Sequence, residues 1–94
     1  MRKVGKGKPG KGSWLVVWRG VTDGPACGAV AETRDTGLAY AGHLAYGGTA
    51  AAVLLVDTAK GWPVWTHPAK AARLREPLED PWAGEVARIL RGSP

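Results

Sequence analysis

A chain of 94 residues with a single cysteine is long enough for one domain with a thin core, and it cannot form an internal disulfide. It contains five Trp, two Tyr, no Phe and little Leu outside short runs, a composition that disfavours a helical bundle. The longest apolar run, residues 50–56, is far shorter than the ~20 residues of a membrane helix, so we expect a soluble, cytoplasmic protein without membrane association.

The net charge of +5 is concentrated at the start of the chain. No acidic residue precedes Asp23, and residues 13–94 contain as many acidic as basic residues, so the whole excess lies in residues 1–12. Alternating Gly and Lys cannot bury apolar surface, and we therefore expect residues 1–12 to form a disordered basic arm. The cations of this arm are Arg2, Lys3, Lys6, Lys8 and Lys11.

The first strands are expected after the arm. Residues 13–21 alternate, with Trp14 and Trp18 on one face, and this period of two predicts a strand. A strong turn signal at residues 22–25 separates it from a second, antiparallel strand over residues 26–33.

The middle of the chain is harder to interpret. Residues 38–48 contain a short near-repeat, LAYAG followed by LAYGG, for which we favour strand, turn and strand with glycine kinks; a short helix is the alternative. Residues 49–56 form a continuous apolar run that predicts a buried central strand. A hairpin loop then leads to a strand over residues 62–66, where Pro63 is typical of an edge or a strand start.

The last third predicts helical structure. Over residues 68–74 we expect one tight helical turn followed by a short last strand. Asp80 is a favourable N-cap, Pro81 fits the first helical position and Gly92 fits the position just past the end of an amphipathic helix. The apolar face of this helix consists of Trp82, Val86, Ile89 and Leu90.

About five or six short antiparallel strands separated by glycine turns predict a mostly β protein with a small barrel. The segment GWPVWTHPAK, residues 61–70, resembles the end of the SH3-like barrel in the C-terminal domains of retroviral and retrotransposon integrases. There a Trp-x-His strand runs into a tight turn and a basic last strand. Residues 14–19, WLVVWR, are similar to the first strand of that family. The resemblance implies an SH3-like β-barrel over residues 13–76, followed by a linker and the C-terminal helix over residues 77–94.

Binding of nucleic acid or another polyanion is the function that the basic arm favours. Flexible Lys and Arg side chains attract phosphates and release counterions without reading base sequence. Trp62 and Trp65 are the favoured candidates for stacking on unpaired bases, from an aromatic set that also contains Trp14, Trp18, Tyr40 and Tyr46 and of which we expect most to pack in the core. Further phosphate contacts are expected from a face of the barrel that carries Lys60, Lys70, Arg73 and Arg75.

The alternative is a protein-interaction or assembly module, as in an oligomer or a phage or mobile-element accessory protein. It would use an exposed strand edge and the apolar face of the last helix to dock a partner. The balanced charge of residues 13–94 favours this alternative, because a dedicated DNA-binding domain is usually basic itself.

No group of residues predicts catalysis, and we expect neither an enzyme nor a cofactor. Cys27, His43 and His67 lack the close pair of ligands typical of a zinc site, so no metal is expected. We expect His67, between Thr66 and Pro68, to cap a turn.

Overall fold

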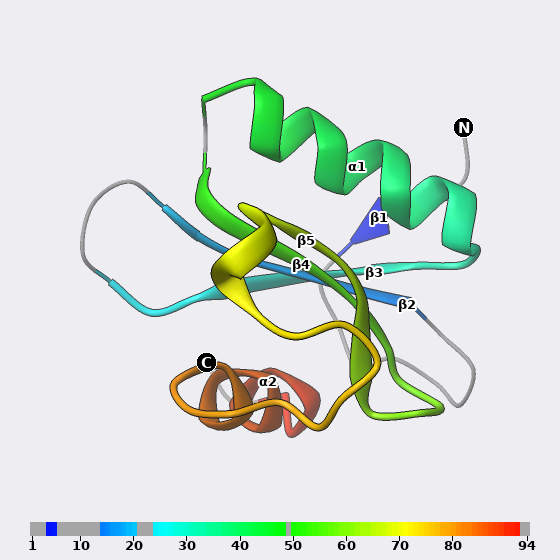
Figure 1. The fold of residues 1–94 in the computed structure, drawn as a ribbon. Coiled ribbons are helices and arrows are strands. Elements are labelled where there is room, and N and C mark those ends of the chain that lie inside the picture. Colours follow the sequence, from blue (N-terminus) through cyan, green and yellow to red (C-terminus); the bar gives the residue numbers. More distant parts are fainter. Residues whose placement is uncertain (1–3, 6–13, 21–23, 49, 93–94) are drawn as a thin grey trace.

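The structure, a computed structural model, describes residues 4–5, 14–20, 24–48 and 50–92. Its strands form one antiparallel sheet in the order β1-β3-β2-β4-β5, and helices α1 and α2 lie on opposite faces of this sheet (Figure 1). In chain order the elements are β1 (Val4–Gly5), β2 (Trp14–Gly20), β3 (Cys27–Ala31), α1 (Arg34–Tyr46), β4 (Ala50–Asp57), β5 (Trp62–His67), the 3₁₀ turn η1 (Ala69–Ala71) and α2 (Trp82–Leu90).

The strand β4 is buried on both faces of the sheet, which explains its uninterrupted apolar sequence. Alternate side chains of a strand point to opposite faces. Leu54 and Val56 therefore join the core beneath α2, whereas Val53 and Leu55 join the core beneath α1. All of them are buried, so the domain has two thin cores that share this strand.

Residues 34–46 form one helix, and the strand, turn and strand expected for residues 38–48 are wrong. The alternative of a short helix is confirmed. The Thr33 hydroxyl accepts a hydrogen bond from the backbone N–H of Thr36 at 3.1 Å, which caps the start of the helix. The side of α1 that faces the sheet is built from small residues and Leu44, and this weak amphipathic contrast hid the helix in the sequence.

The antiparallel strands expected from the sequence are confirmed, but the structure does not show the closed barrel. The sheet order places β1 and β5 at opposite ends. Residues 38–46, within the segment expected to supply a strand, a turn and a second strand, belong to α1, and residues 68–74, expected to end in a short last strand, contain no strand. Without those strands, the described residues form an open sheet with a helix on each face.

The ends of the domain differ in detail from the expected structure. Of the arm, only Val4 and Gly5 are among the described residues, and they pair with Ala31 and Val30 of β3. The five arm cations lie outside the described residues. At the other end, Pro81 occupies the N-cap position of α2 without a side-chain cap, so the expected cap by Asp80 is wrong. The expected tight turn after β5 is η1.

Candidate functional site

Aromatic side chains gather where β5 meets the end of α1. Trp65 lies opposite Leu55 and His67 lies opposite Val53 in the β4–β5 register. Directly opposed residues of paired strands share a face of the sheet. Because Leu55 and Val53 belong to the core beneath α1, the rings of Trp65 and His67 lie on the α1 face.

Tyr46, the last residue of α1, completes this group, which we call the ring cluster (Tyr46, Trp65 and His67). The Trp65 and His67 rings have centroids 6.3 Å apart and planes within 15° of parallel. Tyr46 meets His67 edge to face, with centroids 5.0 Å apart. The Tyr46 side chain is 76% exposed, whereas Trp65 and His67 are half-buried. The cluster is thus anchored in the α1-side core at Trp65 and open to solvent at Tyr46.

The ring cluster contains only one of the two Trp residues expected to stack on bases. Trp62 pairs with Asp57 at the other end of β5, beyond a bulge. His67 contributes its ring to the cluster, and the turn after β5 is closed by the Thr66 hydroxyl, which donates to the carbonyl of Ala69 at 3.3 Å. The sequence contained a signal for the position of His67. It lies two residues after Trp65 in a predicted strand, and residues two apart in a strand share a face of the sheet.

Other aromatic residues serve packing. Trp18 and Tyr40 meet edge to face with centroids 5.8 Å apart, and both pack against the core beneath α1. Trp82 is buried in the core beneath α2, and its indole N–H donates to the carbonyl of Ala71 at 3.1 Å. The ring cluster differs from these packed aromatic residues because one of its rings, Tyr46, is largely exposed.

Cations flank β5 along the chain. Lys60 lies in the turn before the strand and Lys70 lies in η1 after it, and both are exposed. Arg75 adopts a left-handed backbone, with φ of 57°, and its N–H donates to the carbonyl of Pro63 at 2.8 Å. This hydrogen bond brings the loop after η1 back to the first half of β5. Lys60 and Lys70 therefore lie next to the two ends of β5 in the sequence, and the backbone of Arg75 contacts its first half. These are three of the four cations that we expected on one face of the domain.

The fourth face cation, Arg73, is partly offset by a neighbouring acid. Its guanidinium lies 3.7 Å from the carboxylate of Glu76, and both side chains are largely exposed. Such exposed pairs contribute little to stability because solvent screens them. Glu79 and Asp80 follow in the same loop, so residues 70–80 carry no net charge. The net charge of +5 therefore comes from residues 1–12.

The apolar face of α2 is largely used inside the domain. Trp82 and Val86 are buried in the core beneath this helix, and Ile89 packs against it. Leu90 is 38% exposed. Of the residues expected to dock a partner, Leu90 is therefore the one that the structure leaves most accessible.

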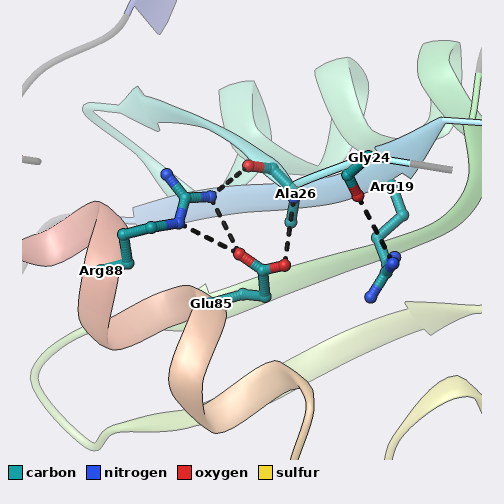
Figure 2. A network of polar contacts seen from close by, with 5 residues as sticks. All are labelled: Arg19, Gly24, Ala26, Glu85 and Arg88. Atoms are coloured by element: carbon teal, nitrogen blue, oxygen red, sulfur yellow. Dashed lines mark hydrogen bonds and ion pairs between the residues drawn. The ribbon is translucent and has the colours of Figure 1, made fainter. Parts of the chain in front are cut away.

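A polar network holds α2 against the start of β3 (Figure 2). Arg88 donates to the carbonyl of Ala26 at 2.6 Å and to the carboxylate of Glu85 at 2.9 and 3.1 Å. The other carboxylate oxygen of Glu85 accepts from the N–H of Ala26 at 3.3 Å. Hydrogen bonding from Arg88, chiefly, lowers the pKa of Glu85, with the Ala26 N–H and the charges of Arg88 and Arg19 acting the same way and burial opposing them. The network is complete within the chain, so its role is structural.

Other candidate chemistry is dispersed. Cys27 lies exposed on β3 and His43 lies exposed on α1. Across the described ranges, no three His, Cys, Asp or Glu side chains come together in a way that could hold a metal ion. Within those same ranges, no helix has the length and apolar character needed to cross a membrane.

Comparison with known proteins gives no relative from which a function could be transferred. No protein-family model matches the chain, and neither the curated proteins nor the solved structures contain a significant match.

Proposed function

We propose that this protein is a non-enzymatic nucleic-acid-binding module, in which the cations of residues 1–12 supply salt-dependent contacts to phosphates. The observation that carries this proposal is the location of the charge. Five cations and no acid lie in residues 1–12, whereas the remaining residues sum to zero. Such a segment raises the local concentration of a polyanion and gains free energy by releasing condensed counterions.

A second set of contacts in this proposal comes from the four cations around β5, Lys60, Lys70, Arg73 and Arg75, which we call the β5 face. Lys60, Lys70 and Arg75 are exposed and flank the strand that carries Trp65 and His67 of the ring cluster. Because the acids of residues 76–80 balance the nearby cations, this face adds local contacts and little long-range attraction. Affinity therefore depends mainly on the arm, and the β5 face determines which part of the nucleic acid lies against the domain.

The test is charge removal in the full chain. An arm variant replaces Arg2, Lys3, Lys6, Lys8 and Lys11 by Gln, and a matched β5 variant replaces Lys60, Lys70, Arg73 and Arg75 by Gln. We expect the arm variant to lose at least about tenfold in affinity for a labelled DNA strand at ~50 mM salt, and the β5 variant to lose less. Fluorescence anisotropy measures both. Wild-type affinity in the arm variant would contradict the proposal.

A protein-interaction module is the second candidate, favoured by the position of β5 at the end of the sheet order. A strand in this position can accept a partner strand. Part of the edge is already used, since Arg75 bonds to Pro63. Sedimentation velocity over a wide concentration range tests the version in which the partner is a second copy. A concentration-dependent dimer supports it, and a monomer throughout contradicts it.

A further inference from the structure

We infer that the ring cluster of Tyr46, Trp65 and His67 is a stacking site for unpaired bases, so that the protein prefers single-stranded nucleic acid to duplex. This inference rests on the proposed function, because the arm must first attract the phosphates. It adds a substrate class, and it joins Tyr46 and His67, which lie far apart in the sequence, to Trp65 in one site.

The exposure of Tyr46 is the first observation behind the inference. At 76% exposed it is the most accessible of the large hydrophobic side chains that the structure describes as exposed. Its edge-to-face contact with His67 gives the ring a fixed neighbour while most of its surface stays in water. A phenol ring held in this way contributes little to the core, but it offers a flat apolar surface to a ligand.

The arrangement of Trp65 and His67 is the second observation. Their planes are within 15° of parallel, and their centroids are 6.3 Å apart along one strand. Trp65 packs against the core beneath α1, so the platform is rigid at that end. A rigid row of rings favours flat aromatic ligands, because successive bases of a flexible strand can stack on it without hydrogen bonds that read sequence.

The charge of the chain favours one class of ligand. Lys70 follows His67 by three positions, and the arm supplies the net charge of +5. A ligand that combines stacked rings with a negative backbone satisfies both features. In a duplex the faces of the bases are hidden by stacking on neighbouring base pairs, and exposing one costs free energy because the base must be unstacked and unpaired. Unpaired strands present those faces directly, which is why they are the favoured substrate.

The experiment compares four probes with the full chain at one low salt concentration. They are a labelled oligo(dT), a strand of equal length in which the bases are replaced by abasic sites, a duplex of equal length, and an uncharged glucan. The dT and abasic strands carry the same phosphates, so their difference isolates stacking. We expect oligo(dT) to bind about tenfold more tightly than the abasic strand, as for one well-stacked base, and more tightly than the duplex.

Variants connect this difference to the ring cluster. Tyr46→Ala should remove at least half of the preference for oligo(dT) over the abasic strand, and Tyr46→Phe should retain it. Because Tyr46 is largely exposed, neither change should disturb folding, which circular dichroism checks. Leu90→Ala, an exposed apolar residue on the opposite face of the sheet, is the matched control and should retain wild-type affinity for every probe.

Several outcomes would overturn the inference. Equal affinity for oligo(dT) and the abasic strand, with salt-dependent binding intact, refutes the stacking site and leaves the proposed function standing. A Tyr46→Ala variant with the full wild-type preference refutes the role of this cluster. Glucan binding as tight as that of oligo(dT) would assign the rings to sugar recognition. Absence of binding to every strand at low salt would overturn the proposed function as well.

Discussion

The closeness of α1 to the sheet is decided at one residue. A Cβ atom added at Gly37 would lie 2.7 Å from Cδ1 of Leu55, whose side chain is fully buried. Gly37 therefore permits a close helix–sheet contact that a larger residue could keep only if the Leu55 side chain shifted. Gly42, in the same helix, has open space where a Cβ would be placed.

This contrast gives a prediction with an internal control. Ala at either position gains about 0.5–1 kcal/mol of helix propensity over Gly. Gly42→Ala should gain that amount in the free energy of unfolding. Gly37→Ala should lose about 1–2 kcal/mol net, because Leu55 must move within a packed core. Urea unfolding measures both variants. Equal stabilisation by the two substitutions would show that the Leu55 side chain moves aside without cost.

Sequence reasoning at the residue scale succeeded where local pattern decides and failed where distant residues meet. The Trp-x-His spacing in a predicted strand puts Trp65 and His67 on one face, so that pair was within reach. The contact between Tyr46 and His67 could not be predicted in this way, because it forms only when α1 packs on the sheet. Trp62 shares a strand with Trp65, but the bulge and the distance along β5 separate it from the ring cluster.

At the scale of elements, the docking of α2 depends on Glu85 and Arg88. The Glu85 side chain is only 18% exposed and bonds to both Arg88 and Ala26, the residue that directly precedes β3. These bonds require the ionised carboxylate and hold the pKa of Glu85 below its usual value of 4.5. Folding therefore gains stability from Glu85 above that value, and loses it as the pH falls through the lowered pKa of the folded state.

Replacement of Glu85 by Gln should consequently destabilise the protein at neutral pH and matter little in acid. We expect a loss of about 1 kcal/mol at pH ~7, since the neutral amide forms no ion pair with Arg88 and its NH2 group cannot accept a hydrogen bond from the N–H of Ala26. The difference between wild type and Glu85→Gln should shrink as the pH falls below 4.5 and through the lowered pKa of Glu85. Thermal unfolding followed across this range measures it.

Glu79 is the matched control for this experiment because its side chain lies exposed in the loop before α2. Glu79→Gln should unfold at nearly the same temperature as the wild type throughout the range. A Glu85→Gln variant with an unchanged melting temperature at pH ~7 would mean that α2 is held by its apolar face alone.

The predictability of the elements follows from how much of their signal is local. The strands β2 and β4 were predicted because an alternating aromatic and β-branched pattern and a continuous apolar run are both typical of strands, and the middle of each strand is buried on both faces of the sheet. The helix α1 was misjudged because its small residues fit either a helix or kinked strands, and only packing of Gly37 and Ala41 on the sheet distinguishes them. The predicted start of α2 was one residue too early, because Asp80 as N-cap and Pro81 as first helical residue both satisfy general rules for helix starts.

At the scale of the whole molecule, the sequence predicted a β-rich domain but not how its sheet ends. Whether the outer strands meet to close a barrel depends on strand number, twist and tilt, none of which is written in the local pattern. The structure resolves the question for the described residues with an open sheet covered by α1 and α2. The separation of charge, by contrast, was fully readable, since it needs only the positions of acids and bases.

The central claim is that the charge of residues 1–12 governs binding, and the salt dependence of affinity tests it most directly. For single strands, log K falls by about 0.7 per phosphate neutralised for each unit of log salt, so five arm cations predict a slope near −3.5. Anisotropy titrations of labelled oligo(dT) with the full chain, between ~50 and ~200 mM salt, give this slope. A value between about −3 and −4 is the predicted result. A slope near zero, or no binding at the lowest salt, would contradict the account.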